Sequence, residues 1–138
     1  MSGERIRVKA GLDELARVRA FVERQATAAG LSQDAAAELV LAVDEAVSNC
    51  VEHGLRGNDG AIEVCVVAQH DAVRVIVRDD AVLFDPTRAI AATLEVSPLD
   101  RARPGGFGVE LMHRLVDKVD YRVTGDGQNE LTLWKRRP

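Results

Sequence analysis

The spacing of apolar and polar residues divides the chain into helices, most of them in the first half, and strands that pair as hairpins. Apolar residues at helical spacing predict three helices, over residues 12–29, 33–53 and 106–117. Alternating or β-branched runs predict five strands, over residues 4–9, 61–68, 72–78, 119–124 and 129–135. The short links QHD and GDGQ are typical of hairpin turns. Gly30 and Gly54 are expected to end the first two helices, and Ser32 to cap the second.

The element order β-α-α-β-β-loop-α-β-β predicts an α+β fold. We expect a two-layer sandwich in which helices cover one face of a mixed, mostly antiparallel sheet. At 138 residues the chain is expected to form one domain, over residues 1–138. Residues 79–105 show no clear period apart from a weak helical stretch near 88–94. A connection this long is usually a functional lid or disordered.

Composition narrows the class of protein. Hydrophobic residues make up 46% of the chain, and the net charge of −4 argues against a broad nucleic-acid-binding surface. No apolar run has the length of a membrane span, and the first ten residues lack the apolar core of a signal peptide. Cys50 and Cys65 lie among apolar neighbours and are expected to be reduced core thiols. A cytoplasmic protein with no membrane or direct nucleic-acid partner is therefore expected.

Three polar residues recur every fourth position on the otherwise apolar helix predicted over 33–53. Glu45, Asn49 and His53 lie in one stripe along a helical face. The Asn49 amide oxygen suits Mg²⁺, which prefers hard oxygen ligands, and Glu45 could accept a proton from an attacking hydroxyl. The other reading is a helix face partly open to solvent, and His53 reads as a helix-end residue.

A carboxylate ends the apolar strand predicted over 72–78. Asp79 could accept a hydrogen bond from a donor on a buried ligand, such as an exocyclic amine, or it could be a helix cap or turn residue. Asp85, which precedes a proline, is most simply turn chemistry.

A glycine-rich turn, PGGFG, enters the last predicted helix. Gly105, Gly106 and Gly108 permit close backbone approach, and the helix N-terminus presents unpaired N–H groups. Such a terminus binds anions, phosphate above all, although a plain flexible turn has the same composition. The chain lacks the GxxxxGK[ST] pattern, and its glycines lack the strand context of a dinucleotide fingerprint.

Taken in order, three stretches resemble the GHKL superfamily of histidine-kinase-like ATPases, which share the Bergerat fold. The stretches are ELVLAVDEAVSNCVEHG, VIVRDDAVLFDP and PGGFGVELMHRLVDKVDY. The branch they resemble is the bacterial anti-sigma-factor serine/threonine kinases, and the likeness runs from about residue 4 to 136.

The resemblance implies a function and a set of site residues. It implies an ATP-dependent protein serine kinase that phosphorylates a STAS-type anti-sigma-factor antagonist, binds a sigma factor in a partner-switching cycle, and commonly forms a homodimer. It implies that residues 86–104 form an ATP lid. The site residues it implies are Glu45 as general base, Asn49 as the Mg²⁺ ligand, Asp79 as acceptor from the adenine amino group, and Gly105, Gly106, Phe107 and Gly108 as the lining of the triphosphate.

One position departs from the family pattern. The first glycine box of the family usually reads Asp-x-Gly, whereas here it reads Asp79-Asp80-Ala81. A methyl group at this position crowds the adenine or disfavours a positive φ. A second reading therefore stays open, in which the chain is a partner-binding regulator on the same fold with little or no nucleotide chemistry.

Overall fold

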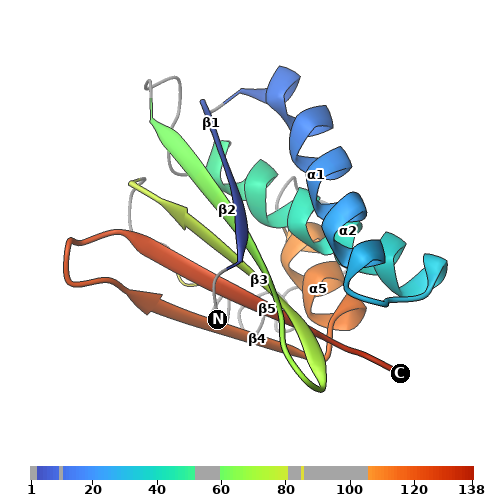
Figure 1. Cartoon of the computed structure of the whole chain (residues 1–138). Coiled ribbons are helices and arrows are strands. Elements are labelled where there is room, and N and C mark those ends of the chain that lie inside the picture. Colours follow the sequence, from blue (N-terminus) through green and yellow to red (C-terminus); the bar gives the residue numbers. More distant parts are fainter. Residues whose placement is uncertain (1–2, 10, 52–59, 81–84, 86–105) are drawn as a thin grey trace.

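The structure is a computed structural model, and it describes residues 3–9, 11–51, 60–80, 85 and 106–138. Its elements, shown in Figure 1, are β1 (Glu4–Lys9), a 3₁₀ turn η1 (Leu12–Glu14), α1 (Leu15–Ala28), α2 (Gln33–Asn49), β2 (Ala61–Ala68), β3 (Ala72–Asp79), α5 (Gly106–Leu115), β4 (Lys118–Val123) and β5 (Asn129–Arg136). The predicted order of helices and strands is confirmed for the described elements. The expected helix end at Gly54, the helical stretch near 88–94 and the lid at 86–104 lie outside the described residues.

The five strands form one sheet in the order β1-β2-β3-β5-β4, and the helices lie together on one face of it (Figure 1). The predicted α+β sandwich is therefore confirmed. The expectation of a mixed sheet was wrong for the described strands, because every pairing between them is antiparallel. β3 and β4 run in the same direction, but β5 lies between them, so these two parallel strands never pair.

The core lies between the helix layer and the facing side of the sheet. Alternate residues of the central strands and one stripe of each helix supply it, as binary patterning requires. The largest side chains in this core with under 2% of their surface exposed are Leu39, Ile62, Met112 and Leu133. Burying a side chain of this size stabilises the fold by about 1.5–3 kcal/mol.

The helix boundaries follow from local chemistry. Ser32 caps α2, since its Oγ accepts a hydrogen bond of 3.1 Å from the Ala35 N–H. Gly30, at φ +96°, makes the left-handed turn after α1 that a residue with a Cβ rarely adopts. After Asn49, the chain continues through Cys50 and Val51 as a π-type turn.

The last helix is two residues shorter than predicted. It ends at Leu115, and the backbone N–H of Asp117 already donates to the Trp134 carbonyl at 2.8 Å. Pairing with β5 therefore ends the helix. None of the described helices combines the length and the apolar character that crossing a membrane requires.

Candidate functional site

Asp79 is a buried carboxylate at the end of β3, and only 3% of its surface is exposed. Its Oδ1 accepts a hydrogen bond of 2.9 Å from Asn129 Nδ2, at the start of β5. Its Oδ2 accepts one of 3.0 Å from the Cys50 thiol, just past α2. The carboxylate thus lies where the end of the sheet meets the end of the second helix.

Asn129 is itself hydrogen-bonded to a polar residue of the next strand, Tyr121. The Tyr121 hydroxyl of β4 donates to Asn129 Oδ1, so a line of hydrogen bonds runs from β4 through β5 to β3. Tyr121, Asn129 and Cys50 were not among the residues predicted from the sequence. Asp79 and Asn129 are spaced by two residues from the buried valines of β3 and leucines of β5, and this spacing places them on the core-facing side. The spacing does not identify β5 as the neighbour of β3.

The Cys50 thiol acts as a hydrogen-bond donor in this line. Burial, together with the charge and hydrogen bond of Asp79, raises the pKa of the Cys50 thiol well above its ordinary value. The thiol therefore stays protonated and can donate to the carboxylate. Cys50 and Cys65 are both free, in agreement with the expectation of reduced thiols.

Asn49 lies immediately before Cys50, in the last turn of α2, and is 8% exposed. Within the described part of the chain, its amide makes no hydrogen bond to another side chain. A buried amide without such a partner fits a ligand-binding role better than a structural one, because buried polar groups are usually hydrogen-bonded.

The donor set also fits Mg²⁺. Among the described residues, no three His, Cys, Asp or Glu side chains come close enough to hold a metal ion. The Asn49 amide oxygen would be one hard oxygen ligand, and water and the oxygens of a bound phosphate could supply others. Mg²⁺ commonly binds in this way, through few protein ligands.

Glu45 lies one turn before Asn49 on α2 and is half-buried. Its neighbour Asp44 has a different task, since Arg19 of α1 donates to both carboxylate oxygens of Asp44, at 2.8 and 3.1 Å. Asp44 thus ties the two helices together, whereas Glu45 shares its stripe of the helix with the buried Asn49. Of the stripe residues that the structure describes, Asn49 is buried and Glu45 is partly open to solvent.

The glycine-rich turn is described only from Gly106 onward. Gly106, Phe107 and Gly108 form the first turn of α5, which packs against α2 in the helix layer (Figure 1). The first N–H groups of a helix lack partners within that helix and can bind an anion. Gly105 lies outside the described residues.

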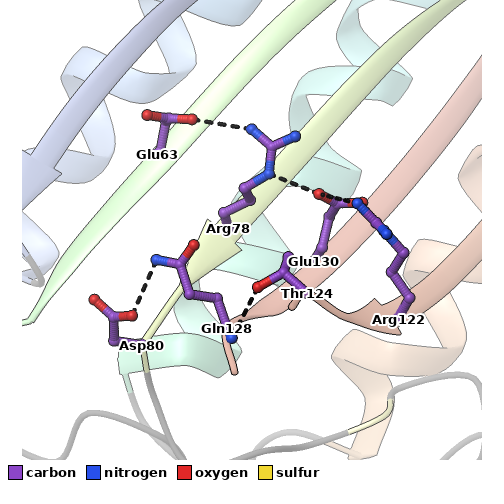
Figure 2. Close-up of polar contacts among 7 residues, drawn as sticks. All are labelled: Glu63, Arg78, Asp80, Arg122, Thr124, Gln128 and Glu130. Atoms are coloured by element: carbon purple, nitrogen blue, oxygen red, sulfur yellow. Dashed lines mark hydrogen bonds and ion pairs between the residues drawn. The ribbon is translucent and has the colours of Figure 1, made fainter. Parts of the chain in front are cut away.

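On the opposite face of the sheet, four charged residues form ion pairs between strands at the end where Asp79 lies. Figure 2 shows Arg78 of β3 between Glu63 of β2 and Glu130 of β5, at 3.1 and 2.6 Å. Arg122 of β4 binds the same Glu130 carboxylate at 2.5 Å. The hydrogen bond from Arg122, then that from Arg78, lowers the pKa of the Glu130 carboxyl below its ordinary value. Four strands are thereby connected next to Asp79.

Two further hydrogen bonds hold the chain beyond this network. Gln128 Nε2 donates to the Asp80 carboxylate at 2.9 Å, and the Gln128 N–H donates to Thr124 Oγ1 at 3.0 Å (Figure 2). The turn between β4 and β5 is thus connected to the residue that follows Asp79.

Comparisons with known proteins place the chain among histidine kinase-like ATPase domains. The family model for the histidine kinase-like ATPase domain matches residues 8–135. The serine/threonine-protein kinase BtrW of Bordetella bronchiseptica is 36% identical over 96 residues, which cover 69% of this chain and 66% of that protein. The serine-protein kinase RsbW of Listeria monocytogenes is 36% identical over 102 residues, which cover 68% of this chain and 62% of that protein.

A more distant relative is covered over more of its length. The serine-protein kinase RsbW of Staphylococcus epidermidis is 28% identical over 126 residues, 87% of this chain and 79% of that protein. A crystal structure of the RsbU and RsbW domains of a Mycobacterium tuberculosis protein superposes with a TM-score of 0.64 at 24% identity. It covers 98% of this chain and 33% of that one, and it shows a shared fold.

Proposed function

The chain belongs to the histidine kinase-like ATPase domain family, and on that basis we propose that it is an ATP-dependent protein serine kinase that acts as an anti-sigma factor. The observation that supports the proposal is the contact between the end of α2, where Asn49 lies, and the end of β3, where Asp79 lies. The hydrogen bond between Cys50 and Asp79 brings the end of α2, and with it Asn49, to the end of β3. The curated relatives, which are named serine kinases, support the choice of reaction.

Each residue of the site has one task in this proposal. Asp79 accepts a hydrogen bond from the adenine amino group, and Asn49 holds Mg²⁺ through its amide oxygen. The first turn of α5, with Gly106, Phe107 and Gly108, directs backbone N–H groups toward the phosphates, and Gly105 extends that lining. When bound, Mg-ATP supplies the phosphoryl group and neutralises the charge that develops on it.

Glu45 is the proposed general base. It takes the proton of the acceptor serine while the serine oxygen bonds to the γ-phosphorus and the bond to the ADP oxygen breaks. Its half-buried place one turn from Asn49 keeps the carboxylate near the metal ligand. Positioning of the two reactants then provides most of the remaining rate enhancement.

The proposed protein partners are a STAS-type antagonist, which carries the acceptor serine, and a sigma factor. Phosphorylation adds a charge of roughly −2 at the contact with the antagonist, which weakens that complex. The kinase is then available to bind the sigma factor. In this proposal the protein works in the cytoplasm, as a homodimer, without contacting nucleic acid itself.

A second candidate function is a partner-binding regulator that has kept the fold and lost the chemistry. The observation that favours it is Ala81, which stands where the family usually has glycine. Its position lies outside the described residues. A buried amide and a carboxylate on one helical stripe, Asn49 and Glu45, favour the kinase.

Calorimetric titration of the purified protein with ATP, with and without Mg²⁺, tests the proposal. Saturable binding that requires Mg²⁺ is expected, followed by transfer of labelled γ-phosphate to a STAS-domain protein. Absence of binding up to millimolar ATP contradicts the kinase. Recovery of binding in Ala81→Gly would then favour the second candidate.

A further inference from the structure

We propose that Asn129, held by Tyr121, is a positioning residue that keeps Asp79 selective for a purine with an amino group. The inference rests on the proposed function and adds a determinant of which nucleotide the site accepts. It starts from the position of the two residues in the sheet. Asp79 and Asn129 are register partners across β3 and β5, and both are at least 95% buried.

The orientation of the Asn129 amide follows from its contacts with Tyr121 and Asp79. Tyr121 donates to Oδ1, and Nδ2 donates to Asp79 Oδ1 at 2.9 Å. A flipped amide would place its oxygen against the carboxylate, with two acceptors facing one another and no proton between them. The carboxylate therefore selects the donor side of the amide, and the Tyr121 hydroxyl holds the other end of the same amide through Oδ1.

Asn129 and Cys50 both bind the carboxylate as donors, Asn129 at Oδ1 and Cys50 at Oδ2. Each oxygen of an ionised carboxylate can accept more than one hydrogen bond. The carboxylate is thus held in one rotamer and keeps its character as an acceptor. An amino group of a ligand satisfies it, whereas a keto oxygen at the same place would face another acceptor.

The Asn129 side chain is not needed to set the register of the two strands. The next register pair, Arg78 and Glu130, forms a 2.6 Å ion pair on the other face, and backbone pairing extends from Ala72 to Asp79. A buried amide that duplicates this link is better explained by its effect on Asp79. The prediction is therefore a change in selectivity rather than in strand pairing.

The test compares Mg-ATP with Mg-ITP, whose base has a keto group in place of the amino group. Tyr121→Phe keeps the ring but removes the hydroxyl that holds the amide through Oδ1, and Asn129→Ala removes the amide. In both variants we expect the affinity ratio of ATP to ITP, measured by calorimetry, to fall about tenfold, the effect of one hydrogen bond to a charged group.

Glu130→Gln is the matched control, because it weakens the ion pair on the far face next to Asn129. It should lower the unfolding temperature and leave the ATP-to-ITP ratio unchanged. Should Asn129→Ala fail to fold, Tyr121→Phe decides the question alone. The inference is overturned if the wild-type protein binds ATP and the Tyr121→Phe and Asn129→Ala variants keep its ATP-to-ITP affinity ratio. If the wild-type protein binds neither nucleotide, the proposed function is overturned and the inference with it.

Discussion

Asp79 and Asn129 face each other across β3 and β5, joined by a 2.9 Å hydrogen bond on the side of the sheet that the helices cover. The adjacent register pair, Arg78 and Glu130, is joined on the uncovered side. Because successive side chains of a strand point to opposite faces, one end of the sheet carries a buried carboxylate on one face and a set of ion pairs on the other. Backbone pairing from Ala72 to Asp79 sets the register that brings Asn129 to Asp79, and the ion pair adds stability beside it.

Asn49→Ala is expected to abolish Mg-dependent ATP binding while the protein stays folded. The amide has no hydrogen-bonded side-chain partner in the described part of the chain, so its removal leaves no such partner unsatisfied. The free energy of unfolding should therefore change by less than about 1 kcal/mol. Calorimetry with Mg-ATP and urea unfolding measure the two effects. A variant that binds Mg-ATP as tightly as the wild type would remove Asn49 from the site.

Glu45→Gln is expected to retain ATP and to lose phosphoryl transfer by about 10²–10⁴-fold, the usual contribution of a general base. Glu38→Gln is the matched control, because Glu38 lies on the same helix but is exposed, 3.5 Å from Lys135. Transfer to a serine substrate is followed with labelled ATP at saturating concentration. Equal rates in the two variants would exclude Glu45 as the base.

The ion pairs of Glu130 should make stability depend on acid pH. Its pKa is lowered in the folded protein, first by the hydrogen bond from Arg122. The stabilisation is therefore complete above the unfolded pKa of about 4.3 and is lost as the pH falls through the lower folded value. The difference in unfolding free energy between wild type and Glu130→Gln should shrink as the pH falls from 7 to 3.

Urea unfolding at a series of pH values measures this difference. Glu23→Gln, a change at an exposed carboxylate of α1, serves as the control and should follow the wild type throughout. A difference for Glu130→Gln that stays constant down to pH 3 would show that the ion pairs add nothing.

Substituting two leucines of α2, one buried and one exposed, distinguishes the contribution of core packing to stability from that of helix propensity. Leu39 of α2 is fully buried, whereas Leu41 is 40% exposed. Leu39→Ala should lower the free energy of unfolding by about 2–5 kcal/mol, because it leaves a cavity between α2 and the sheet. Leu41→Ala should stay within about 0.5 kcal/mol of the wild type. Similar losses in both variants, measured by urea unfolding, would contradict this account of the core.

The elements and the family could be predicted from the sequence because their signals are local. The β2–β3 and β4–β5 hairpins follow from β-branched runs separated by turn residues, and Ser32 and Gly30 mark helix ends through their own side chain and backbone. The family predicted from three motifs is confirmed by the match over residues 8–135. Glu45, Asn49 and Asp79 could be singled out as candidates because one stripe of a helix and one strand end carry them, and their roles stay predictions.

Only the tertiary structure decided what surrounds Asp79. Alternation along β3 and β5 predicts which face each residue occupies, but strand order depends on contacts between residues far apart in the chain, such as Asp79 with Asn129, and no local pattern encodes these. The insertion of β5 between β3 and β4 brought Asn129 to the carboxylate and Tyr121 to Asn129, and the packing of α2 brought Cys50 to the carboxylate. The sequence by itself thus determined the elements and the chemistry of single residues, whereas long-range packing determined which of them share a site.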